Sequence, residues 1–138
     1  MAKRATVVRS SSRYIGKQGP TYAGGLSAES AGSEHLWLVR VEVPPGGRTK
    51  AHLHERRESA IYVFEGECDV YTGADLSEHE VLGAGEYVYI PQNVPHVAVN
   101  RSATTPLVAI IARADPNEQE SVVLLPELEA AVPSSRRD

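Results

Sequence analysis

The sequence has little of several features that define large classes of proteins. Its 138 residues include one cysteine, Cys68, so no disulfide can form within the chain and nothing points to an oxidising compartment. No apolar run approaches the roughly 18 residues of a membrane-spanning helix, and the first residues do not show the succession of basic region, apolar region and cleavage site that marks a secretion signal. We therefore expect a cytoplasmic protein without a membrane partner.

The sequence also has fewer positively charged residues than negatively charged ones. The 14 lysines and arginines are outnumbered by 18 aspartates and glutamates, which gives a formal net charge of −4. A chain with this balance has no general electrostatic attraction to the phosphates of nucleic acid. The sequence also contains no serine nucleophile elbow, no phosphate-binding glycine loop and no CxxC pair. We expect no nucleic-acid partner and none of the chemistry that depends on those motifs.

The sequence does contain a series of short, apolar, strand-like segments. From Trp37 to Val43 valines alternate with Arg40 and Glu42, which is the period of a half-buried strand. Further segments rich in β-branched and aromatic residues are bounded by glycine or proline: SAIYVFEGECDVY, EYVYIP, HVAVN, PLVAIIA and SVVLLP. This many short strands in one domain's length predict an all-β sandwich or barrel.

The two ends of the chain have a different character. Residues 8–34 are rich in serine and glycine and show little periodicity, which predicts a loop or arm. Near the other end, PELEAAV is briefly helical, with Pro126 in the position of a helix opener. The predicted organisation is an N-terminal arm over residues 1–34, a β-barrel over residues 35–126, and a short helix and tail over residues 127–138.

Three histidines form the candidate site. His52 and His54 share one face of a strand because side chains alternate, so their imidazoles could bind one cation. A His-x-His pair alone fits a surface or packing role equally well. His96 follows a glycine turn, a strand and a proline-rich bend in GEYVYIPQNVPHVAVN, so a third imidazole enters from a neighbouring part of the sheet.

The spacing of these residues resembles the cupin family, whose two motifs are approximately G-x5-H-x-H-x3/4-E-x6-G and G-x5-P-x-G-x2-H-x3-N. The matching residues are Gly46, His52, His54 and Gly66 in the first motif and Gly85, Pro91, His96 and Asn100 in the second. Asn93 stands where the family has glycine, a mild departure because asparagine tolerates positive φ better than most residues. The resemblance implies a single-domain jelly-roll β-barrel that holds a metal ion inside, and it implies a homodimer.

The glutamate of the first motif is displaced. Counting back from Gly66 by the family's usual interval reaches Ser59, whereas Glu58 fits only the shorter spacing from His54. If Ser59 points inward, strand parity sends Glu58 outward. We favour a site of three histidines, His52, His54 and His96, with Glu58 as the alternative fourth ligand. Glu58 and Ser59 are also the candidate catalytic residues.

The same parity predicts a mostly apolar pocket. Its expected lining is His52, His54, Ser59, Ile61, Val63, His96 and Ala98, with Lys50 nearer the mouth. Three neutral imidazoles leave the charge of a divalent ion uncompensated and leave coordination positions open. Such a site suits a small, anionic, chelating substrate such as an organic acid, enol or enediolate.

The chemistry stays open between three functions. We favour Fe(II) and dioxygenase-type chemistry, although imidazole ligands also suit Zn, Mn, Ni and Cu. A metal-dependent isomerase, dehydratase or hydrolase is the alternative among enzymes. A non-catalytic small-molecule-binding or sensing cupin is the alternative from another class, because one fold hosts many functions.

Overall fold

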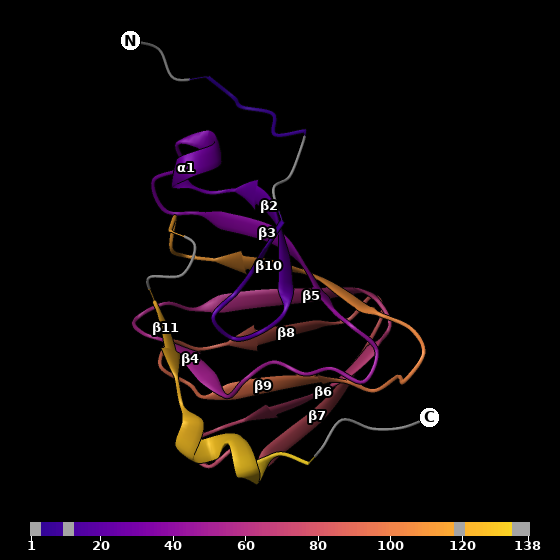
Figure 1. Cartoon of the computed structure of the whole chain (residues 1–138). Helices are drawn as coiled ribbons and strands as arrows, with labels where there is room; N and C mark the ends of the chain where they lie inside the picture. The colour runs from indigo at the N-terminus through magenta and orange to yellow at the C-terminus, as the bar shows by residue number, and fades with distance from the viewer. Residues whose placement is uncertain (1–3, 10–12, 118–120, 134–138) are drawn as a thin grey trace.

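The computed structural model describes residues 4–9, 13–117 and 121–133. Two antiparallel sheets face each other and enclose the interior (Figure 1). The first sheet has the order β1 (Arg13–Ile15), β2 (Thr21–Leu26), β3 (Trp37–Val43), β10 (Leu107–Arg113), β5 (Ser59–Glu65) and β8 (Tyr87–Ile90). The second has the order β11 (Val122–Leu124), β4 (His52–His54), β9 (His96–Asn100), β6 (Glu67–Thr72) and β7 (Glu78–Gly83).

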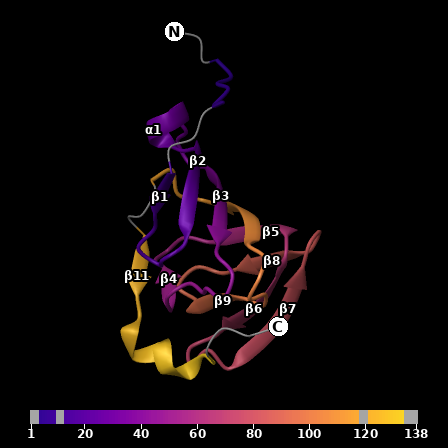
Figure 2. The same cartoon turned by 45° about the vertical axis from the view of Figure 1, so that its right-hand side comes forward.

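The chain crosses between the two sheets repeatedly after β3, so that β4, β6, β7 and β9 lie in one sheet and β5, β8 and β10 in the other (Figure 2). The alternation from Trp37 to Val43 is seen in the structure, since every second side chain is buried. The all-β prediction is confirmed. None of the helices in the described residues has the length and apolar character that crossing a membrane requires.

The segment expected to be an arm contains regular structure. Strands β1 and β2 form a hairpin, and a single-turn helix, α1 (Ala28–Ala31), follows. Strand β2 pairs with β3 across a register shift, and Gly25 is required there because a Cβ atom would collide with the carbonyl oxygen of Leu38. Tyr22 is buried and packs against Trp37, with ring centroids 5.9 Å apart. Tertiary contacts with β3 thus form these strands where the local pattern is weak.

Apolar side chains fill the space between the sheets and also cover the outer side of the second sheet. Two clusters lie inside: Tyr22, Trp37, Val39, Val41, Ala109 and Ile111 in one, and Val43, Val63, Cys68, Val70, Leu82 and Leu107 in the other. A third consists of Ala51, Leu76, Val97, Val99 and Val132. The 3-10 helix η1 (Pro126–Ala131) packs on this third cluster through Leu128. It is the short helix expected near the end of the chain, and residues 134–138 of the expected tail lie outside the described residues.

Asn100, at the end of β9, joins the loop between β3 and β4 to the loop between β9 and β10. Its side-chain amide is fully buried and donates to the carbonyl oxygens of Val43, Pro44 and Thr105, at 3.2, 3.1 and 2.9 Å. Its side-chain oxygen accepts from the backbone N–H of Ser102 at 2.9 Å. The asparagine of the second motif therefore fixes the fold and lies away from the histidines.

Replacing Asn100 by alanine should lower the free energy of unfolding by about 3 kcal/mol, because buried carbonyl groups lose their donor. Urea denaturation of the variant and the wild type measures this difference. Gln92→Ala, at an exposed position, is the control and should change stability little. An Asn100→Ala variant as stable as this control would contradict the structural role.

Candidate metal centre

The barrel brings the three predicted histidines together. Strands β4 and β9 are neighbours, and His52 pairs directly with His96 across them. His54 lies on the same face of β4 as His52, and all three side chains are buried. One ring nitrogen from each lies within 4.8 Å of the others. This is near the roughly 3 to 4 Å spacing of nitrogen ligands that share an ion at about 2.1 Å.

Backbone carbonyl groups fix which nitrogen of two histidines faces the centre. His52 Nδ1 lies 2.7 Å from the carbonyl oxygen of Lys50, and His96 Nδ1 lies 2.9 Å from that of Val94. A carbonyl can only accept a hydrogen bond, so both Nδ1 atoms carry the proton and both Nε2 atoms keep a lone pair. His54 Nδ1 makes a longer contact, 3.4 Å, with the hydroxyl of Ser121. This outer hydrogen bonding is typical of histidines that bind metal ions.

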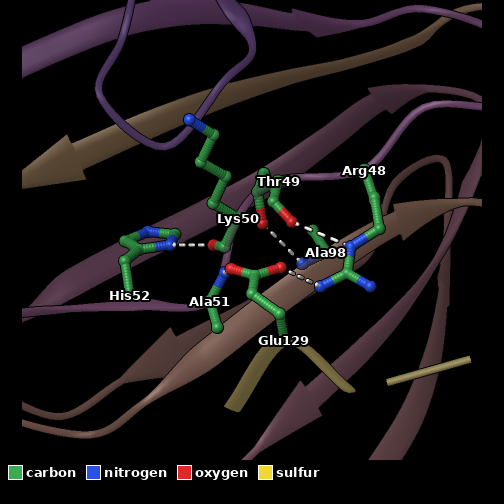
Figure 3. A network of polar contacts seen from close by, with 7 residues as sticks. All are labelled: Arg48, Thr49, Lys50, Ala51, His52, Ala98 and Glu129. Atoms are coloured by element: carbon green, nitrogen blue, oxygen red, sulfur yellow. Dashed lines mark hydrogen bonds and ion pairs between the residues drawn. The ribbon is translucent and has the colours of Figure 1, made fainter. Parts of the chain in front are cut away.

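A polar network outside the cavity holds the start of β4 in place (Figure 3). Glu129 of η1 accepts a hydrogen bond from the backbone N–H of Ala51 at 2.6 Å and pairs with Arg48 at 2.9 Å. The same peptide group carries the carbonyl of Lys50, which orients His52. The C-terminal 3-10 helix therefore helps to position His52, although it lies far from this histidine in sequence.

Burial keeps the imidazoles uncharged. It lowers the pKa of His96 to about 4, against an ordinary value of 6.5. Burial also lowers the pKa of His52, with a further contribution from His96, and that of His54, with a further contribution from the Arg113 guanidinium. Near neutral pH all three rings are therefore in the form that binds a metal ion.

The histidines line a cavity between the sheets. Its volume is about 60 Å³, taken as the space open to the centre of a water molecule. Besides the histidines, its lining includes Pro20, Tyr22, Val41, Val43, Ser59, Ile61, Val63, Val70, Leu82, Val88, Ala98 and Ile111. The inward residues predicted from parity all lie on this surface, and Lys50 is exposed. No carboxylate belongs to the lining among the residues that the structure describes.

The side chains of Glu58 and Ser59 lie on opposite sides of the cavity wall, one outside the barrel and one inside it. Ser59 is buried and lines the cavity, whereas Glu58 is exposed and interacts with Tyr89. The carboxylate of Glu58 belongs neither to the cavity lining nor to the cluster of possible ligand atoms. The geometry brings Ser59 to the site and leaves Glu58 outside it.

Three polar residues that line the cavity were missed by sequence reasoning: Arg113, Gln18 and Thr49. Arg113, at the end of β10, is 3% exposed, and its Nε donates to Ser59 Oγ at 3.4 Å. Its guanidinium also lies 4.0 Å from the ring centroid of Trp37. Gln18, in the hairpin loop between β1 and β2, is 1% exposed. Strand parity with Ile111 could have placed Arg113 inside, but the aperiodic loop gives no such signal for Gln18.

Two antiparallel sheets around a buried three-histidine cluster define a small β-barrel protein with a site able to hold a metal ion. The sequence matches the family model described as a cupin domain over residues 39–112, more than half of the chain. The protein therefore belongs to the cupin family. Asn93, at the glycine position of the second motif, has a φ of 62° and so adopts the left-handed conformation that glycine favours.

The chain is also similar to known proteins in sequence and in fold. It is 32% identical to germin-like protein subfamily 2 member 4 of Arabidopsis thaliana over 77 residues, which is 54% of this chain and 35% of that protein. The chain thus spans about a third of the length of this curated relative.

Among solved structures, Lactobacillus farciminis oxalate decarboxylase superposes with a TM-score of 0.70 at 20% identity, over 89% of this chain and 36% of that one. The polyketide cyclase RemF of Streptomyces resistomycificus superposes with a TM-score of 0.63 at 26% identity, over 91% and 86% of the two chains. The first likeness shows the fold alone. The jelly-roll prediction is confirmed by these cupin structures.

Proposed function

We propose that this protein binds one divalent metal ion through His52, His54 and His96 and acts on a small, chelating organic molecule. The observation that carries the proposal is the convergence of three buried, neutral imidazoles on one cavity. Carbonyl acceptors already orient two of them with Nε2 available. The donor set fits a first-row divalent ion, and three ligands leave positions open for a substrate.

Fe(II) is the ion that we favour, with Zn, Mn, Ni and Cu as alternatives that imidazole also suits. A bound ion supplies Lewis acidity and, if it is iron, reactivity toward O2. The chain's own contribution is a cavity with mostly apolar walls and a ligand set without negative charge. An anionic, enolisable substrate would bring the missing charge.

Dioxygenase-type chemistry is the first candidate reaction, because it needs open positions beside the ion. Metal-dependent chemistry without O2, such as isomerisation, dehydration or hydrolysis, is the second. The likeness to RemF, a polyketide cyclase that this chain covers over most of its length, favours the second candidate. A non-catalytic role in binding or sensing a small molecule uses the same site, and we place it third.

Metal titration followed by O2 measurement tests this order. The metal-free protein should bind one equivalent of Fe(II), Zn(II) or Mn(II) by calorimetry. The Fe(II) form should then consume O2 with one member of a panel of catechols and enols. Turnover of an enol by the Zn(II) form without O2 uptake would favour the second candidate. Failure to bind any of the three ions would refute the proposed function.

A homodimer and a cytoplasmic location complete the proposal. Large apolar side chains on the outer face of β5 and β8 support self-association, since Phe64 is 62% exposed and Tyr87 is 76% exposed. The cytoplasmic location stays a prediction from the sequence.

A further inference from the structure

Arg113 and Gln18 line the same cavity as the histidines but do not belong to the set that would hold the metal. We propose that these two residues recognise a small hydroxy- or oxo-carboxylate, with Arg113 binding its carboxylate and Gln18 binding its hydroxyl or carbonyl group. This inference deepens the proposed function and rests on it, because the bound acid would lie beside the metal ion.

Arg113 supplies a buried positive charge to the wall of the cavity. Contacts with the hydroxyl of Ser59 and the ring of Trp37 hold its side chain there. A planar guanidinium binds carboxylates through two parallel hydrogen bonds. The charge of a divalent ion adds to that of Arg113, and the apolar surroundings screen both weakly. A cavity with these charges favours an anion over a neutral molecule of the same shape.

Gln18 supplies a side-chain amide that has no hydrogen-bond partner within the described part of the chain. Neither its Nε2 nor its Oε1 has a hydrogen bond to any described residue, although the side chain is buried. A buried amide in this state costs folding free energy, so the native protein carries a polar group that a ligand can satisfy. A hydroxyl suits it best, since it can accept from Nε2 and donate to Oε1.

The loop around Gln18 holds this residue in place. Its backbone oxygen accepts from the N–H of Lys50 at 2.6 Å, and Gly16 N donates to Pro20 O at 3.0 Å across the loop. A Cβ atom at Gly16 would lie 2.9 Å from Gln18 Oε1 and 2.6 Å from the ring of Tyr22. Glycine at this position therefore leaves the room that the amide occupies.

Three small compounds of similar size test the proposed contacts of Arg113 and Gln18 separately. Lactate has a carboxylate and a hydroxyl, propionate lacks the hydroxyl, and lactamide lacks the charge. Their size, a few heavy atoms each, suits a cavity of about 60 Å³. Trp37 is the only tryptophan and lies against Arg113, so its fluorescence reports binding, with calorimetry as the second measurement. Lactate should bind the Zn(II)-loaded wild type about 10-fold tighter than propionate and about 100-fold tighter than lactamide.

Two variants assign these preferences to residues. Arg113→Gln should lose the preference for lactate over lactamide, whereas Arg40→Gln, on the outer face of the same sheet, should keep it. Gln18→Leu should lose only the preference for lactate over propionate. It should also unfold at the same or a higher urea concentration than the wild type, because it removes an unpaired amide. A purely structural Gln18 would make the variant less stable.

The outcomes distinguish this inference from the proposed function. Zinc stoichiometry should remain one in both variants, and the order of the three compounds should persist, more weakly, in the metal-free protein. If the wild type binds zinc but binds lactate and lactamide with equal affinity, the further inference is wrong and the proposed function still stands. Loss of the preference for lactate over lactamide in Arg40→Gln would also overturn the inference, because the preference would then reflect the net charge of the protein. If Arg113→Gln does not fold, the order of the affinities for the three compounds, measured in the wild type and in Gln18→Leu, decides whether the inference holds.

Discussion

Replacing His54 by alanine should abolish stoichiometric metal binding, whereas replacing Glu58 by alanine should leave it unchanged. His54 contributes one of three imidazole nitrogens within 4.8 Å of one another, and the described lining contains no carboxylate to take its place. The loss should exceed the roughly 10- to 100-fold that removing an outer hydrogen-bond partner costs. Glu58 is exposed and interacts with Tyr89, so its removal changes nothing inside the cavity.

Calorimetric titration with Zn(II) and metal analysis after dialysis measure both effects. His79→Ala is the matched control, because that histidine lies in β7, does not line the cavity and bonds to Asp69 at 2.7 Å. This control should bind one equivalent, like the wild type. Loss of metal in Glu58→Ala as complete as in His54→Ala would show that Glu58 is a ligand and that the chain rearranges to admit it.

Local regularity in the sequence predicts the strands and the shared face of His52 and His54, whereas the jelly-roll barrel and the grouping of these histidines with His96 come from the resemblance to the cupin motifs. Alternation in Trp37 to Val43 is enough to define a half-buried strand, and the period of two sets His52 and His54 on one face. The same period separates Ser59 from Glu58 correctly, since the structure buries the first and exposes the second. These inferences need no knowledge of distant contacts.

The parts that were not predicted depend on distant contacts. Strands β1 and β2 are short and contain or adjoin glycine, so their pairing with β3 decides their structure. Gln18 belongs to the loop between them, and its burial follows from that pairing. Arg113 is the last residue of an otherwise apolar strand and would ordinarily be expected at the surface, yet Trp37 on the neighbouring strand provides an aromatic ring for its guanidinium.

The metal-free protein should lose stability steeply as the pH falls below about 6.5. Each of the three histidines has a lowered pKa in the folded state, chiefly through burial, and the nearby imidazoles and Arg113 add to the effect. In the unfolded chain the same residues titrate near 6.5. Between that value and about 4, where His96 begins to accept a proton in the folded protein, the unfolded state binds more protons. The free energy of unfolding therefore falls with falling pH across this range.

The expected slope is large because three residues act together. Each contributes up to about 1.4 kcal/mol per pH unit, so the three together contribute up to about 4 kcal/mol per unit. A typical domain has a total stability of only about 5 to 15 kcal/mol, so the metal-free protein should unfold within this acidic range. Urea denaturation in the presence of a chelator, at pH 7.0, 6.0 and 5.5, measures the slope. His54→Leu should reduce it by about a third, since one proton fewer distinguishes the two states. A stability that stays constant from pH 7.0 to 5.5 would show that the imidazoles become protonated in the folded barrel, which contradicts the neutral site on which the metal proposal depends.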